Sequence, residues 1–491
     1  MNYCTPEKAG ISSADVLKFL KHLDAYNLST HSVLLAKGDD IFLECYYAPF
    51  NKEFKHRMYS VTKTFVSVAI GFCEQDGLIS LDDPMVKYFP EYVNDKTNDR
   101  MLKTTIREML KMETSHEYNV NWFYSGTKDR VETYFRVTGD KNSGCLFSYD
   151  SQGSYMLGVI VEKVTGKPFV EYLKDKALRD IGFSEDAYCL KAPGGYSWGD
   201  SAMMCTAKDL LLFSRFVLNK GTWNGKRYLN KEYLDAATDT SQVCNSEYGF
   251  VGHDTFGYGY QIWGCPKDCF GMFGMGGQFA ICDPRHDFIF VINSDNQGNP
   301  RMAEQIFDCL YNDIIANLED KPLAESEKQI KVLDNYVSSR KLFALNENSD
   351  APIKEQINGR KFICEKNPMG IKWFRFDFDG KKALFNYENE QGEKTLPFGL
   401  GYNEFGKFPQ TGYSDMIGTV GVPGHQYDCA ASADFPEEQK LRIRVQIIDK
   451  CFGNLAMLFG FKDENTVSVR MTKCAEAFLD EYQGIMNAHS M

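Results

Sequence analysis

A serine and a lysine stand three residues apart at Ser60 and Lys63, at the head of a long apolar run. In a helix, this spacing places the two side chains one turn apart on the same face. A helix that begins near Ser60 would also set its hydroxyl among free N–H groups, at the positive end of the helix dipole. A lysine one turn away can take or hold the hydroxyl proton, as a serine nucleophile requires. We therefore predict that Ser60 is a nucleophile and Lys63 its proton carrier; the alternative is a core helix with an incidental serine and lysine.

The same spacing recurs at Ser125–Lys128 and Ser338–Lys341, so by itself it is a weak signal. Ser125 is followed by glycine and a polar, charged stretch, whereas Ser338 lies in a charged segment typical of a solvated helix. Only Ser60 precedes a segment, residues 61–72, that is apolar enough to form a buried helix. The context therefore favours Ser60 among the three serines.

A second motif, Tyr149-Asp150-Ser151, lies just before a predicted helix at residues 154–164. In an extended loop, Tyr149 and Ser151 are two apart and point the same way. A phenol beside a lysine ammonium has its pKa lowered, because the cation favours the phenolate. We expect Tyr149 to serve as the base for Ser60; the alternative is a tyrosine that only packs and hydrogen-bonds.

A third motif is the glycine-rich stretch of residues 271–279, which ends in Gly276, Gly277, Gln278 and Phe279. Glycine weakens a strand, so a close approach of the backbone to a ligand is a natural reason for it. The alternative is a turn or a bulge.

Strand patterns occur at both ends of the first 320 residues, and helical patterns fill the middle. Residues 12–26 predict a helix, residues 32–47 and 278–292 predict two hairpins, and residues 258–263 predict a further strand. We therefore predict an α+β domain at residues 1–320, with an antiparallel sheet flanked by helices and an all-helical insertion. Residues 321–350 are expected to be a helical linker, and residues 351–491 a C-terminal all-β sandwich or barrel.

The net charge of −12 argues against nucleic acid or an anionic membrane as the main partner. The N-terminus shows no apolar signal region and no run approaches 18 apolar residues, so we expect a cytoplasmic protein. Its fifteen cysteines are then expected to be reduced thiols. Cys265 and Cys269 are not followed by a second pair at ligand spacing, so no metal site is expected.

Taken together, the three motifs resemble the serine β-lactamase and penicillin-binding-protein superfamily, and the chain looks closest to its class C β-lactamase-like esterases and peptidases. Ser60-Val61-Thr62-Lys63 is similar to the family's S-x-x-K motif, and Tyr149-Asp150-Ser151 to its Tyr-x-Asn or Tyr-x-Ser element. The resemblance covers about residues 5–320, and it extends to the segments 77–84, 152–169, 206–210 and 219–226.

The resemblance implies an acyl-enzyme mechanism on a small ester, amide or short peptide, without a cofactor or metal. Ser60 would attack the carbonyl, Lys63 and Tyr149 would share the proton relay, and Ser151 would orient the lysine or the leaving group. The backbone N–H groups of Ser60 and Gln278, beside Gly276 and Gly277, would form the oxyanion hole.

The chain departs from the family pattern at the third motif, which is Lys-Thr-Gly or His-x-Gly in relatives. The matching place here is Met275-Gly276-Gly277, which has no cation to bind a substrate carboxylate. This favours uncharged esters or amides over β-lactams; β-lactamase or D-amino-acid peptidase activity and a non-catalytic binder or assembly protein are the alternatives. Asp150, which would add negative charge if exposed, and His116 are further candidates for the substrate pocket beside Met275. The oligomeric state stays open.

Overall fold

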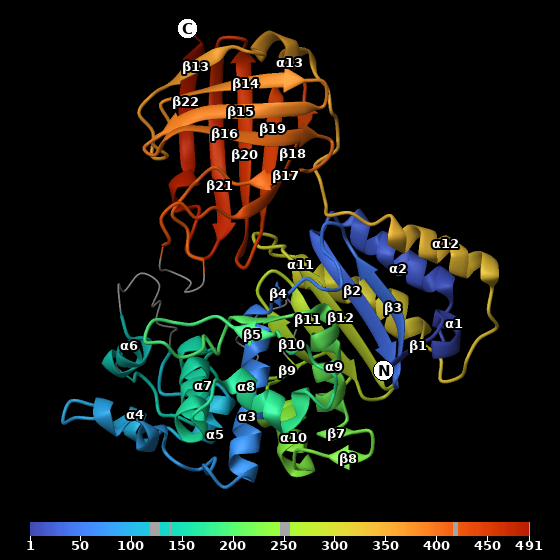
Figure 1. Ribbon diagram of the computed structural model, residues 1–491, viewed down its shortest axis with the longest axis vertical. Coiled ribbons are helices and arrows are strands. Elements are labelled where there is room, and N and C mark those ends of the chain that lie inside the picture. The colour runs from blue at the N-terminus through green and yellow to red at the C-terminus, as the bar shows by residue number, and fades with distance from the viewer. Residues whose placement is uncertain (118–127, 138, 246–255, 416–420, 491) are drawn as a thin grey trace. The chain divides into compact units, whose positions relative to one another are not determined.

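The computed structural model describes the chain except for residues 118–127, 138, 246–255, 416–420 and 491. The chain forms two compact units, Met1–Lys341 and Leu342–Met491 (Figure 1). In the described residues, no helix is both long enough and apolar enough to cross a membrane.

The first unit is built on a seven-stranded sheet with the order β1-β3-β2-β12-β11-β10-β9. Its strands are β1 (Asn2–Tyr3), β2 (Thr30–Lys37), β3 (Asp40–Tyr46), β9 (Trp263–Gly264), β10 (Phe270–Gly274), β11 (Gln278–Asp283) and β12 (Phe288–Ser294). All neighbours run antiparallel except β1 and β3, which are parallel. The predicted α+β fold is therefore confirmed, with the first hairpin (β2 and β3) joined to the last (β11 and β12) through the β2–β12 pair.

One predicted strand is mostly absent. Of residues 258–263, only the last enters a strand, as the first residue of β9, and Tyr258 makes isolated bridges with Val243 and Trp263. Gln261 has a φ of 58°, a left-handed conformation that interrupts an extended run. The glycine-rich segment supplies β10 instead.

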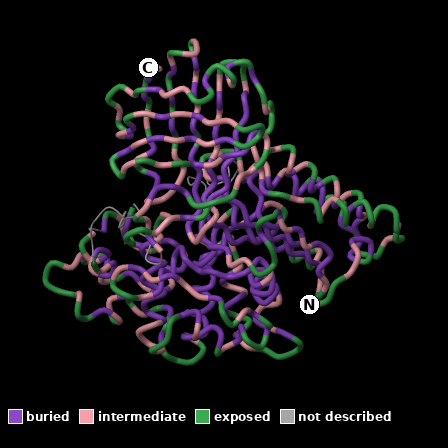
Figure 2. The backbone as a smooth tube through the Cα atoms, turned by 45° about the horizontal axis from the view of Figure 1, so that its top comes forward, coloured by how far each residue is buried: buried purple, intermediate pink, exposed green. Residues whose placement is uncertain are grey.

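Alternate residues of each strand point to opposite sides of the sheet. Both faces are buried, because helices pack against each of them. Leu34 and Val291 belong to the core that contains α3, α7 and α9, whereas Leu35 and Phe290 belong to the core that contains α2 and α11. Figure 2 shows buried backbone running through the interior of the first unit. The helices outside the insertion are α1 (Pro6–Ala9), α2 (Ser13–Ala25), α11 (Met302–Cys309) and α12 (Glu327–Ser338).

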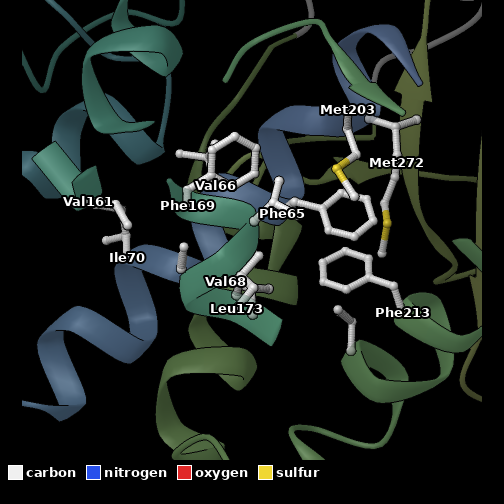
Figure 3. Close-up of a cluster of buried hydrophobic side chains, with 14 of the residues drawn as sticks. Phe65, Val66, Val68, Ile70, Val161, Phe169, Leu173, Met203, Phe213 and Met272 are labelled. Carbon is white, nitrogen blue, oxygen red and sulfur yellow. The ribbon is translucent and has the colours of Figure 1, made fainter. Parts of the chain in front are cut away.

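The insertion between β3 and β9 is mainly helical. Its α-helices are α3 (Thr62–Gln75), α4 (Asp99–Lys103), α5 (Ile106–Leu110), α6 (Arg130–Arg136), α7 (Ser151–Thr165), α8 (Phe169–Leu173), α9 (Ala207–Leu218) and α10 (Lys231–Thr238). Helix α3 is buried on all sides from Thr62 to Cys73, as a helix in the middle of a core should be. Its Phe65 stacks on Phe213 of α9 with ring centroids 3.7 Å apart, in the cluster drawn in Figure 3. Burial of each such ring contributes roughly 1.5–3 kcal/mol.

Helix α12 lies within the predicted linker but packs against the first unit. Tyr336 donates its hydroxyl to Asp24 of α2, and the guanidinium of Arg340 binds the same carboxylate. The units divide between Lys341 and Leu342, so residues 321–341 go with the first unit rather than with a separate linker.

The second unit is a β-barrel, one of the two predicted alternatives. Its short helix is α13 (Pro352–Ile357), and its strands are β13 (Lys361–Cys364), β14 (Trp373–Asp379), β15 (Lys382–Asn389), β16 (Gly392–Leu400), β17 (Glu404–Lys407), β18 (Asp428–Glu437), β19 (Lys440–Ile448), β20 (Phe452–Asp463), β21 (Thr466–Ala475) and β22 (Gly484–Ser490). Pairing of β16 with β18 closes the sheet. Stacked rings such as Phe362 and Phe374, with centroids 5.2 Å apart, fill its interior.

His56, which lies just before Ser60 in the chain, forms a buried pair with His31 of β2. Strand β4 (His56–Arg57) pairs with β6 (Met203–Cys205), which also pairs with β5 (Tyr188–Cys189). His56 Nε2 lies 2.8 Å from His31 Nδ1, and His56 Nδ1 donates to the Arg57 carbonyl oxygen at 2.9 Å. Burial lowers the pKa of His56 to about 3, against a small opposing effect of that backbone hydrogen bond.

This pKa predicts acid sensitivity of folding. The unfolded chain protonates His56 near its ordinary pKa of about 6.5, whereas the folded chain keeps it neutral, so stability falls with pH below about 6.5 and the loss levels off near 3. Between pH 7.5 and pH 5, urea denaturation should show about 2 kcal/mol less stability from this group. His56→Gln should remove that part of the pH dependence, and exposed His489→Gln should not. An unchanged pH dependence in His56→Gln would contradict the assignment.

Candidate active site

Ser60 stands in the tight turn that starts the central helix. A single 3-10 turn, Tyr59–Val61, leads into α3 at Thr62, and Ser60 is half-buried there. Tyr59 has a φ of 46°, a left-handed conformation that costs an L-residue about 1–2 kcal/mol. Burial of the Tyr59 ring and its stacking with Arg57, whose guanidinium carbon lies 4.2 Å from the ring centroid, offset this strain. The turn therefore places Ser60 at the head of the helix.

Lys63 contacts Ser60 directly. Its side chain is 2% exposed, and Nζ donates to Ser60 Oγ at 2.8 Å and to the carbonyl oxygen of Asp200 at 2.7 Å. The helical spacing thus brings the two predicted residues together. The Ser338–Lys341 pair has a different setting, because Ser338 lies on the exposed end of α12. Ser125 lies outside the described residues.

Tyr149 contacts both Ser60 and Lys63. Its side chain hydrogen-bonds Ser60, and Lys63 Nζ lies 5.0 Å from the centroid of its ring. The expected lowering of its pKa is wrong: burial raises the pKa of Tyr149 above its usual range, the bond with Ser60 opposes this rise, and the Asp200 carboxylate adds to it. The physical reason is that desolvation of the phenolate outweighs the lowering effect of the hydrogen bond with Ser60. Tyr149 is therefore a protonated phenol at neutral pH.

Asp150 and His116 are interior residues, each 1% exposed. Asp150 is the N-cap of α7, accepting hydrogen bonds from the Gly153 N–H and the Thr114 hydroxyl at 2.9 Å each, and His116 Nδ1 lies 3.4 Å from its carboxylate. Burial would raise the pKa of Asp150, but the interaction with His116 and these hydrogen bonds hold it below its ordinary value. Both residues thus support the loop that carries Tyr149. Ser151 is the first residue of α7 and is half-buried.

The glycine-rich motif forms the end of β10, a turn, and the start of β11. A Cβ on Gly274 would lie 2.4 Å from the carbonyl oxygen of Met58, so only glycine lets β10 come this close to the Ser60 turn. Gly276 and Gly277 have φ values of 80° and 94°, which suit the turn. The close approach found here is to the nucleophile's own chain segment, and the motif also forms the turn given as the alternative. An approach to a ligand stays a prediction.

Gln278 acts on this turn through its side chain. It is fully buried, and Nε2 donates to the carbonyl oxygens of Met275 and Ser294 at 2.8 and 2.6 Å. Because β11 lies between β10 and β12, its backbone N–H groups face neighbouring strands. Met275 follows the last residue of β10, and its N–H has no hydrogen-bond acceptor among the described residues. The geometry therefore favours Met275 over the predicted Gln278 as the second oxyanion donor; its side chain is half-buried.

The sequence did not predict the role of the loop of residues 198–201, in which the Asp200 carbonyl oxygen accepts a hydrogen bond from Lys63. Arg57 stacks on Trp198 at 4.4 Å and donates to the Ser201 carbonyl oxygen at 3.1 Å. Arg130 donates to both carboxylate oxygens of Asp200, at 2.6 and 3.0 Å. Motif spacing carries no signal for these contacts, since Asp200 is 70 residues from Arg130 and 137 from Lys63.

A second cluster of side chains, outside the Ser60 site, contains three residue types that can bind metals. Its members are His22, Cys309 and Asp313, and their donor atoms lie within 4.8 Å of one another. The Asp313 carboxylate already binds His22 Nδ1 at 2.7 Å and Lys18 Nζ at 2.8 Å. Burial raises the pKa of the Cys309 thiol, which disfavours the thiolate that a metal needs. The group is better described as an ion-pair cluster. Cys265 and Cys269 are buried free thiols.

Comparison with known proteins gives the same superfamily. A family model described as Beta-lactamase matches residues 18–308. A 6-aminohexanoate-dimer hydrolase of Paenarthrobacter ureafaciens is 25% identical over 285 residues, which cover 53% of this chain and 71% of that protein.

Solved structures share the fold. "Putative 6-aminohexanoate-dimer hydrolase from Bacillus anthracis" aligns with a TM-score of 0.54 at 20% identity, covering 65% of this chain and 87% of that one. EstCE1, a hydrolase with promiscuous acyltransferase activity, aligns with a TM-score of 0.50 at 15% identity, covering 61% and 99%. At these identities the likeness concerns the fold.

Proposed function

Because this chain belongs to the β-lactamase family, we propose that it is a serine hydrolase that acts through an acyl-enzyme on small, uncharged esters or amides. One observation carries the proposal: Ser60 Oγ is hydrogen-bonded both by Lys63 Nζ, at 2.8 Å, and by the Tyr149 side chain. A serine with two proton-handling groups in contact is the arrangement that nucleophilic catalysis needs.

In the first step, Ser60 Oγ bonds to the substrate carbonyl carbon, and its proton passes to Lys63 in the amine form. The Ser60 N–H and the Met275 N–H bind the resulting oxyanion, and loss of one such donor costs about 10²–10³-fold in comparable sites. The bond to the leaving group then breaks, and the leaving group takes a proton from the Tyr149 phenol, which Lys63 resupplies. In the second half, water attacks the acyl carbon and gives a proton to Lys63. The Oγ–carbon bond then breaks, and Lys63 returns the proton to Ser60 Oγ.

Two features near Ser60 support uncharged substrates: the missing cation at Met275 and the aromatic side chains beside Tyr149. Met275 stands where relatives carry a cation, so a substrate carboxylate finds no ion pair from this position. Tyr149 packs against Trp263 with ring centroids 5.4 Å apart, and Trp263 stacks on Phe273, which gives this side of the site an apolar wall. The relative named for the 6-aminohexanoate dimer supports an amide bond as the one cleaved. That dimer carries a terminal carboxylate, so it supports the bond type and not the absence of charge.

The test is a substrate panel: p-nitrophenyl acetate and butyrate, 6-aminohexanoate dimer, and nitrocefin. We expect a rapid burst with the esters, followed by steady turnover. A charged hydrogen bond is worth about 1.5–3 kcal/mol, so nitrocefin, which lacks its ion pair here, should show kcat/KM about 10–100-fold below the best ester.

Other outcomes distinguish the alternatives. Efficient nitrocefin turnover would favour a β-lactamase. An acyl-enzyme that persists in the mass spectrum without turnover would favour a non-catalytic binder of the penicillin-binding type.

A further inference from the structure

Arg130 and Asp200 form an ion pair in the interior of the first unit. Arg130, the first residue of α6, is 1% exposed and Asp200 is 4% exposed. The guanidinium binds both carboxylate oxygens, at 2.6 and 3.0 Å, and stacks on Tyr155 at 4.3 Å. A bidentate arginine–carboxylate pair fixes direction as well as distance, which a lysine does not.

The residue that Arg130 holds is also the residue that holds Lys63. The carbonyl oxygen of Asp200 accepts from Lys63 Nζ at 2.7 Å, while Nζ also contacts Ser60 Oγ at 2.8 Å. These two contacts restrict where the nitrogen on the flexible stem of Lys63 can lie. The position of the Asp200 backbone therefore sets the direction of Nζ toward the nucleophile.

We propose that Arg130 is a positioning residue: by clamping the Asp200 carboxylate, it holds the Asp200 carbonyl where Lys63 Nζ must bind to face Ser60. Its effect on rate rests on the proposed serine hydrolase function. Its effect on the geometry of Lys63 does not. A displacement of a proton-transfer group by about 1 Å can cost about 100-fold in rate.

The kinetic test compares Arg130→Lys and Arg130→Gln with the wild type. Lysine keeps the charge but loses the bidentate geometry, so kcat for p-nitrophenyl butyrate should fall about 10-fold; glutamine should lower it about 100-fold. KM should stay within about twofold, because a buried residue that acts through Lys63 leaves ground-state binding unchanged.

Two further variants separate positioning from stability. Arg215→Lys is a matched control. Arg215 is also 1% exposed, and its guanidinium binds Asp287 in the turn between β11 and β12, at the opposite end of β11 from Gln278. The substitution should alter Tm but not kcat. Because Arg130→Gln leaves a buried carboxylate unpaired, the neutral pair Arg130→Gln/Asp200→Asn replaces it where the single variant does not fold.

Crystal structures supply a readout that does not depend on activity. In Arg130→Gln, or in the neutral pair, Lys63 Nζ should no longer lie within hydrogen-bond distance of the Asp200 carbonyl oxygen. If the contact stays at its wild-type distance, or if folded Arg130 variants keep wild-type kcat, the positioning role is overturned. A lost contact in a protein that hydrolyses nothing would support the positioning role and overturn the proposed function.

Discussion

Ser60→Ala should abolish formation of the acyl-enzyme. The variant removes the side chain that bonds to the substrate carbon in the proposed mechanism, and removal of a serine nucleophile lowers kcat by at least about 10⁴-fold. A fluorophosphonate probe should label the wild type once and leave Ser60→Ala unlabelled, and mass spectrometry of the labelled peptide should place the probe on Ser60. The fold should persist, because Ser60 is half-buried and the substitution removes only its hydroxyl group.

Ser338→Ala is the matched control for this experiment. Ser338 has the same spacing to a lysine, but it lies on the exposed end of α12. Labelling and turnover of Ser338→Ala should equal those of the wild type. Equal labelling of Ser60→Ala and the wild type would remove Ser60 from the mechanism.

The sequence was sufficient for the parts of the fold that local patterns determine. Helix α3 follows from an apolar run with no polar face, and the hairpin of β11 and β12 follows from two apolar runs around a turn. The contact of Lys63 with Ser60 follows from helical geometry alone. Each of these depends on residues within about 15 positions of one another, which is the range over which spacing carries information.

Contacts between segments far apart in the chain could not be predicted from the sequence. Nothing in the composition of residues 258–263 shows that Gln261 turns the chain there, because its side chain is fixed by α5, where Nε2 donates to the Met109 and Leu110 carbonyl oxygens. The Arg130–Asp200 clamp likewise depends on three segments that only the tertiary fold brings together. The pKa of Tyr149 was misjudged for a related reason: the attraction of a neighbouring lysine can be inferred from motifs, but the extent of burial cannot.

Tyr149→Phe should lower kcat about 10²–10⁴-fold with little change in KM, because it removes the proposed proton donor to the leaving group while keeping the ring. The ring contact with Trp263 should persist in the variant, so stability should change little. Tyr155→Phe is the control, since Tyr155 is buried and its hydroxyl has no hydrogen-bond partner among the described residues.

The pH profile decides which form of Tyr149 acts. If Tyr149 worked as a phenolate base, kcat/KM would rise with pH through a pKa near neutrality, and Tyr149→Phe would lose that rise. Because burial raises the pKa of Tyr149 above its usual range, the phenol stays protonated between pH 6 and pH 9. We therefore expect any rise in the wild-type profile over this range to remain in the residual activity of Tyr149→Phe. A rise that disappears with the hydroxyl would restore the phenolate mechanism and would mean that the lysine, not burial, controls this tyrosine.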